Sequence, residues 1–157
     1  MGIRSYAFAA AAVIAAAFGP YDIVMHPTDR AAGVTATARL VFATSPFGVA
    51  YTRDGHASFD VQITTTGLPD PSTFGAYKNY IAWEVSTDLS VWNRLGTIAN
   101  GSSTVGATAL NKFLIVVTAE SSPTSATHAG PVIMRGYSAS TLLQTFLTHP
   151  LFRGLPP

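Results

Sequence analysis

The stretch "YKNYIAWEVSTDLSVWNRLG", residues 77–96, holds both tryptophans of the chain and two of its six tyrosines. Two strands joined by a turn at "TDLS" fit this stretch, because alternate residues of a strand point to opposite faces of a sheet. We expect one face to fill the core around Trp83 and the other to be exposed. The predicted inward side chains are Ile81, Trp83 and Val85, and the predicted outward ones are Tyr80, Ala82 and Glu84.

Similar strand patterns continue on both sides of this hairpin. Asn100-Gly101 is a strong signal for a tight hairpin turn. About seven short strands with regular turn signals predict a mainly β fold, namely an antiparallel, immunoglobulin-like β-sandwich. We assign it to residues 36–136, after a polar linker at 26–35. The predicted strands are 36–44, 57–67, 77–86, 91–98, 103–110, 112–120 and 130–136.

The tail, residues 137–157, is predicted to begin with a short helix. Ser138 or Ser140 would cap its start and Pro150 would end it. A helix of about two turns is not stable alone. We therefore expect it either to cover an open end of the sandwich or to reach a partner. Its predicted apolar stripe is Leu142, Leu143, Phe146 and Leu147.

The N-terminal segment has one basic residue, Arg4, and then no charge before Asp22. We predict a transmembrane anchor over residues 1–25, because a span from Ile3 to about Met25 has the length that a bilayer crossing needs. Arg4 would keep the N-terminus cytoplasmic and place the rest of the chain outside the inner membrane, in the periplasm. The alternative is a cleaved signal peptide with the apolar core Tyr6–Phe18, giving a secreted or periplasmic protein.

Alanine dominates this segment, and small residues let membrane helices approach one another closely. We therefore expect the helix to pack among other transmembrane helices, with Ala11 and Ala15 at the contact. The membrane and other protein subunits are then the predicted partners.

The composition argues against several classes of function. The nine basic residues are scattered and the net charge is +1, so there is no electrostatic footprint for nucleic acid. Without cysteine there is no disulfide, thiolate nucleophile or cysteine-ligated metal. The four histidines lack metal-binding spacing, and "GYSAS" at 136–140 lacks the final glycine of a nucleophile elbow. We predict no catalytic residues, no metal site and no cofactor.

Aromatic side chains are the best candidates for contact with a partner. Tyr77, Tyr80 and Trp92, on the predicted open face of the hairpin, are suited to stacking a sugar or packing a protein. Phe146 and Phe152 are further candidates in the tail.

Five motifs occur in an order that resembles the extracytoplasmic domain of anti-sigma-K factors. The resemblance covers about residues 45–134 and implies a single-span membrane protein with a β-sandwich outside. In that family a cytoplasmic helical domain precedes the span and binds the sigma factor. Here only Met1 to Ser5 precede it, so we do not expect the regulatory activity. The motifs are Gly67-Leu68-Pro69, Tyr80 to Trp83, Leu95-Gly96-Thr97-Ile98, Phe113 to Glu120, and Gly130-Pro131-Val132.

These observations predict a non-catalytic accessory or structural subunit of a bacterial multi-subunit membrane complex. One helix would anchor it, and the periplasmic β-sandwich would brace neighbouring subunits. The alternatives are a secreted or periplasmic ligand-binding module, for copper or a saccharide, and a remnant of an anti-sigma regulator.

Overall fold

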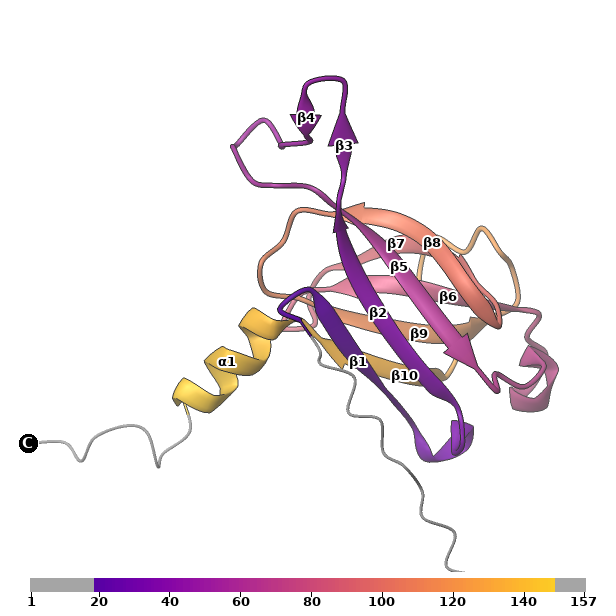
Figure 1. Cartoon of the computed structure of the whole chain (residues 1–157). Helices are drawn as coiled ribbons and strands as arrows, with labels where there is room; N and C mark the ends of the chain where they lie inside the picture. Colours follow the sequence, from indigo (N-terminus) through magenta and orange to yellow (C-terminus); the bar gives the residue numbers. More distant parts are fainter. Residues whose placement is uncertain (1–18, 149–157) are drawn as a thin grey trace, which may run out of the picture.

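The computed structural model describes residues 19–148, which form an antiparallel β-fold followed by one short helix (Figure 1). Eight strands make one sheet in the order β7-β6-β9-β10-β1-β2-β5-β8. The chain is therefore mainly β with antiparallel pairing, as predicted. The strands are β1 (Asp22–Pro27), β2 (Thr35–Phe42), β5 (Phe59–Thr66), β6 (Asn79–Val85), β7 (Trp92–Ile98), β8 (Gly101–Thr108), β9 (Leu114–Glu120) and β10 (Val132–Tyr137).

Strand β1 makes this a single sheet. It pairs with β10 on one side, where Met25 lies opposite Gly136, and with β2 on the other, where Ile23 lies opposite Ala38. The seven strands predicted from the sequence are all present, but without β1 they would divide into β7-β6-β9-β10 and β2-β5-β8. The two sheets of the predicted sandwich are thus one sheet of eight strands.

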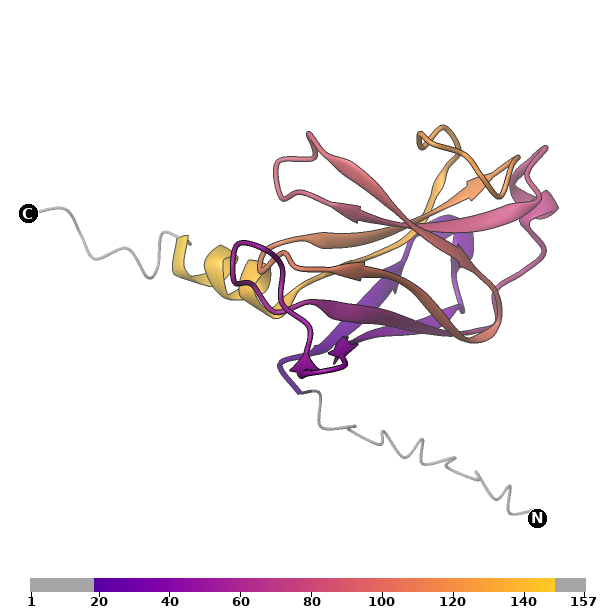
Figure 2. The same cartoon turned by 90° about the horizontal axis from the view of Figure 1, so that it is seen from above.

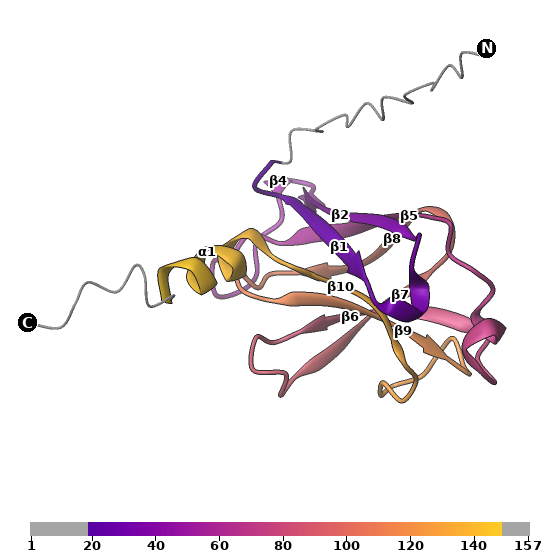
Figure 3. The same ribbon diagram turned by 90° about the horizontal axis from the view of Figure 1, so that it is seen from below.

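The sheet curls until its two edge strands nearly meet (Figures 2 and 3). Strands β7 and β8 are joined by the tight turn at Asn100-Gly101, and Gly101 has the positive φ of 96° that such a turn needs. Two glycines allow the close approach. A Cβ added to Gly96 would lie 3.3 Å from the Cβ of Val105, and one added to Gly106 would lie 3.1 Å from the carbonyl oxygen of Leu95.

The main core fills the inside of the curled sheet. Tyr80 and Ala82 of β6 belong to it, together with Ile63 and Val61 of β5. Both were placed correctly on a shared face by the alternation, but Tyr80 was predicted to be exposed and is only 4% exposed. Other members of this core are Ile23, Met25, Ala38, Phe113, Ile115, Val117, Ile133 and Met134.

Trp83 belongs to a second, smaller core on the other face of β6 and β9. It is fully buried with Ile81, Val85, Leu114 and Val116. These β6 side chains were predicted to fill the centre of the fold. Instead, the side chains on the opposite face of β6 fill the main core, and Trp83 and its neighbours form the second core. Both faces of β6 are buried, so the alternation identified the two faces without showing which one lies inside.

The N-terminal boundary also differs from the prediction. Residues 22–27, taken from the sequence as the end of an anchor and the start of a linker, form β1, and Asp29–Ala31 form a 3-10 turn, η1. Strand structure fits because Ile23 and Met25 alternate with exposed neighbours and are 1% and 3% exposed. Within residues 19–148 no helix has the length and apolarity to cross a bilayer. The rest of the predicted anchor lies outside the described residues.

Helix α1 (Ala139–Thr148) follows β10, close to its predicted position. The Oγ atom of Ser138 accepts a hydrogen bond from the Thr141 N–H at 3.4 Å, so the predicted N-cap is confirmed. Leu142 and Leu143 are 45% and 60% exposed, so these two leucines do not cover the sheet as the first of our alternatives required. The side chains of Phe146 and Leu147 lie outside the described part.

Candidate functional site: an apolar end of the sheet

The strands run between two ends of the molecule (Figure 2). The side chains exposed at these two ends differ in chemistry. At one end, which we call the apolar end, β1 begins, β2 and β10 finish, and helix α1 leaves the sheet. The loops of this end are 43–58, 86–91 and 109–113. The other, polar end consists of loops 28–34, 67–78, 99–100 and 121–131.

Exposed large hydrophobic side chains are concentrated at the apolar end. Among the described side chains, Val24, in the middle of β1, is the single exposed large hydrophobic residue that lies elsewhere. A concentration of exposed apolar side chains on one part of a surface is typical of contact with a protein or a membrane. The side chains are Tyr21, Val41, Phe42, Phe47, Val49, Tyr51, Leu89, Val91, Leu110, Leu142 and Leu143.

The most prominent part of this end is an arm, residues 43–58, that stands away from the sheet between β2 and β5 (Figure 1). It contains the small hairpin of β3 (Thr44–Ser45) and β4 (Gly48–Val49). Its base is tied by backbone hydrogen bonds from Ala43 N to Ser58 O and from Ser58 N to Ala50 O, both 2.9 Å. The arm is therefore an ordered extension of the sheet.

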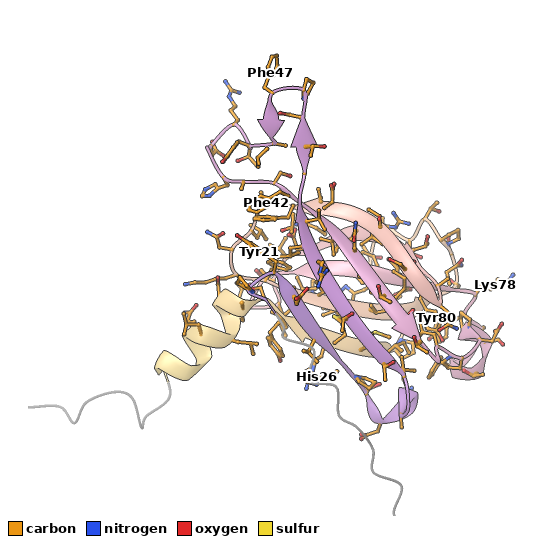
Figure 4. The ribbon with its side chains drawn as sticks, viewed as in Figure 1. Tyr21, His26, Phe42, Phe47, Lys78 and Tyr80 are labelled. Atoms are coloured by element: carbon orange, nitrogen blue, oxygen red, sulfur yellow. The ribbon has the colours of Figure 1, made fainter. Side chains whose placement is uncertain are left out.

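Phe47 occupies the tip of the arm and is 99% exposed (Figure 4). The Ser45 hydroxyl fixes the turn, since its Oγ accepts from Phe47 N at 3.3 Å and donates to Gly48 O at 3.2 Å. Gly48 takes a positive φ of 117°, which favours glycine. The turn thus holds the Phe47 ring in solvent, where it has no partner among the described side chains.

At the foot of the arm three aromatic rings form a cluster (Figure 4). The ring centroids of Tyr21, Phe42 and Phe59 are 4.7 to 5.5 Å apart. These separations are typical of favourable aromatic pairs. The cluster joins the first strand of the sheet to the base of the arm, so the point where the chain enters the fold lies within the apolar end.

The loop between β6 and β7 adds two more exposed residues, Leu89 and Val91. Asp88 fixes this turn, since its carboxylate accepts hydrogen bonds from the hydroxyl groups of Ser86 at 2.5 Å and Ser90 at 2.8 Å. These bonds lower the pKa of Asp88 to about 2. The turn therefore presents its apolar side chains on a hydrogen-bonded frame.

Charged groups at the apolar end are of both signs. Arg39 Nε donates to Asp22 Oδ1 at 2.7 Å, and this pair lowers the pKa of Asp22. The surface therefore carries no strong field of one sign that would select an anionic partner. The charged side chains at or near this end are Asp22, Arg39, Arg53, Asp54, Asp60, Asp88 and Lys112.

The polar end has two open hollows. One, of about 740 Å³, lies between the loop at Leu68–Pro71 and strand β6, with Lys78, Asn79 and Ser103 among its lining residues. The other, of about 610 Å³, lies beside Arg30 and Phe74, at the end of the 3-10 turn η2 (Pro71–Phe74). Among the described residues no group of three or more histidines and carboxylates is placed to hold a metal ion.

The aromatic residues predicted to bind a partner do not share one face. Tyr77 is half-buried against the main core at the polar end. The Tyr80 hydroxyl donates to Pro69 O at 2.9 Å, and burial, with a smaller effect of Asp70, raises the pKa of Tyr80 to about 12. Trp92 is half-buried and stacks on His128 with ring centroids 3.7 Å apart. Ala11, Ala15, Phe152 and the side chain of Phe146 lie outside the described residues.

A buried polar chain fastens the loop 121–131 over the second core. Trp83 Nε1 donates to Thr118 Oγ1 at 2.8 Å, and Thr118 Oγ1 donates to Glu120 Oε1 at 2.7 Å. The same carboxylate oxygen accepts from the N–H groups of Ala129 and Gly130, each at 3.1 Å. Glu120 is 2% exposed, so these donors provide hydrogen bonds that water cannot.

The other glutamate, Glu84, is also buried, although the alternation of β6 predicted it to be exposed. Its carboxylate accepts hydrogen bonds from the Thr108 hydroxyl and, at 3.1 Å, from Asn93 Nδ2. Both glutamates are thus engaged in internal hydrogen bonds that connect neighbouring strands and loops. A glutamate inside an otherwise apolar strand was the one sequence signal for these sites.

Comparisons of the chain with protein-family models, with curated proteins and with solved structures found no match. The fold defines a class, an antiparallel β-domain with a nearly closed eight-stranded sheet. The resemblance to the anti-sigma-K domain stays a prediction from the motifs.

Proposed function

We propose that the protein is a non-catalytic subunit of a bacterial membrane complex, anchored by its N-terminal segment and turned with its apolar end toward the membrane. One observation carries this proposal. The exposed large hydrophobic side chains gather at the end of the sheet where the apolar N-terminal sequence joins the fold. An isolated secreted domain gains nothing from such a surface, whereas a domain beside a membrane can bury it.

The internal chemistry also favours a structural role. Glu84 and Glu120 accept hydrogen bonds from neighbouring donors and are 6% and 2% exposed, so neither is presented to a substrate. The exposed carboxylate of Asp88 is engaged with two serines of its own turn. An accessory subunit of this kind would contribute surfaces and a fixed geometry to its complex.

The association can be tested in the native host. Membranes are extracted in mild detergent and run on a native gel, and the protein is detected by an antibody. We expect it to migrate with other subunits, well above its mass of 16.5 kDa. Migration as a free monomer, in an extract where known complexes of the same membrane stay intact, would contradict the proposal.

The larger hollow at the polar end favours a second candidate, a secreted saccharide-binding module. Lys78, Asn79 and Ser103 line it with hydrogen-bonding groups, whereas no histidine does, which gives copper no support there. N-terminal sequencing of the mature protein separates the two candidates. A mature chain that begins after Phe18 would favour the secreted module, and one that keeps residues 1–18 favours the membrane subunit.

A further inference from the structure

We propose that the apolar end rests on the lipid surface itself and that the arm inserts Phe47 into the boundary between headgroups and acyl chains. The domain would then have a second membrane contact, separate from the N-terminal segment. This inference rests on the proposed membrane location and adds to it a defined orientation and a defined ligand, the bilayer surface.

The path of the chain is the first argument. The sequence before the described part is uncharged after Arg4 and reaches the fold at Gly19. A short turn follows, in which Asp22 N donates to Gly19 O at 3.0 Å and Gly19 N donates to Asp22 Oδ2 at 2.9 Å. Tyr21 is three residues from Phe18, which limits their separation to roughly 10 Å. A membrane anchor in that segment would therefore leave the Tyr21 cluster at the membrane surface.

The shape of the apolar end is the second argument. Its exposed side chains come from separate projections, with Phe47 on the arm, Leu89 on a turn, Leu110 on a loop and Leu143 on the helix. The two hollows described above both open at the polar end. Several separate projections can meet a soft, extended surface together, whereas a peptide or small ligand needs a groove with apolar walls.

The chemistry of the side chains is the third argument. Tyrosine and tryptophan are enriched at membrane–water interfaces, and phenylalanine is typical of the apolar faces that enter the boundary between headgroups and acyl chains. Tyr21, Phe42, Phe47 and Tyr51 provide four such rings at one end of the domain. The nearby charges are of both signs, so the contact should form on zwitterionic lipid and depend little on salt.

The absence of cysteine from the chain permits a direct test. The full-length V49C variant, which keeps Phe47, is labelled with the fluorophore NBD and reconstituted into phosphatidylcholine liposomes. V49C/F47S is the matched control for the ring at the tip, and T127C reports on the exposed loop at the polar end. Nitroxide-labelled lipids serve as the quencher, because they quench only probes that reach the bilayer.

We expect the probe at position 49 to be quenched several-fold more than the probe at 127, and F47S to remove most of that difference. Flotation of the liposomes is measured on the same samples. If the chain floats but positions 49 and 127 are quenched equally, the orientation is refuted while the membrane location stands. If the chain does not float, both are refuted. A blue-shifted but unquenched probe at 49 would show that protein, such as the N-terminal segment, covers the arm instead of lipid.

Discussion

Trp83 is held in place by packing and by a specific hydrogen bond. This hydrogen bond is part of a buried chain of hydrogen bonds that forms one unit. Its indole N–H donates to the Thr118 hydroxyl, which in turn donates to the Glu120 carboxylate. The same carboxylate accepts hydrogen bonds from the backbone N–H groups of residues 129 and 130. Each donor in this chain is buried, so the loss of one partner leaves another group without a hydrogen bond. Such losses cost more than a surface hydrogen bond contributes.

The Thr118→Val substitution tests this unit. Valine has the shape of threonine but no hydroxyl, so Trp83 Nε1 loses its acceptor and Glu120 loses one donor. We expect the free energy of unfolding to fall by about 1–3 kcal/mol. Urea unfolding followed by tryptophan fluorescence measures it. Thr118→Ser keeps the hydroxyl and is the control, with a smaller loss. Equal losses in both variants would mean that packing, not the hydrogen bonds, dominates.

For single residues, the sequence predicted which face of a strand a side chain occupies better than it predicted what covers that face. The alternation in β6 correctly separated Trp83 from Tyr80. It could not show that a loop folds back over Trp83, because residues 121–131 reach that face through tertiary contacts, among them the hydrogen bonds of Glu120 and the stacking of His128 on Trp92. The exposure of Tyr80 and Glu84 was predicted from a sheet with one open face, and β6 has none, while Trp92 of β7 is covered by His128 of the loop.

At the scale of elements, the arm is separable from the sheet that carries it. Phe42 and Phe59 lie opposite each other at the last register position of β2 and β5, and the Ala43 N to Ser58 O bond closes the ladder just beyond them. The arm thus begins where a tight hairpin turn would also fit. Its residues were assigned no element from the sequence because β3 and β4 have two residues each, too few for a periodic pattern.

Replacement of residues 44–57 by Asn-Gly tests this independence. The dipeptide favours a two-residue hairpin turn between Ala43 and Ser58. We expect the free energy of unfolding to change by less than about 1 kcal/mol, because the deleted loop contributes little to the core. Urea unfolding and the dispersion of amide signals in NMR spectra measure the outcome. Loss of the cooperative transition would assign the arm a structural role and weaken its assignment to membrane contact.

Strand β1 shows why element prediction failed at the N-terminus. A continuous apolar run leads up to Tyr21, and Ile23, Val24 and Met25 extend it, so the sequence reads as one long span. The strand is recognisable only from its partners, since the distant strand β10 hydrogen-bonds to one of its edges and the next strand, β2, to the other. Tertiary pairing overrode the local hydrophobic signal.

At the scale of the whole molecule, the protein is polarised between two ends. Its exposed apolar residues are spread along the sequence from Tyr21 to Leu143, and no local pattern connects them. The antiparallel order brings them together, since it places every second connection at the same end of the sheet. The sequence predicted a mainly β, antiparallel fold and seven of its strands, whereas the apolar end becomes visible only in three dimensions.

The most direct test of this polarity is cysteine accessibility in native membranes. Single variants F47C, L89C and L143C at the apolar end, and S72C and T127C at the polar end, are treated with a membrane-impermeant maleimide before and after detergent is added. We predict that the apolar-end positions are labelled several-fold more slowly than the polar-end positions in intact membranes, and equally fast in detergent. Equal labelling at both ends in intact membranes would contradict the central claim that this end faces the membrane.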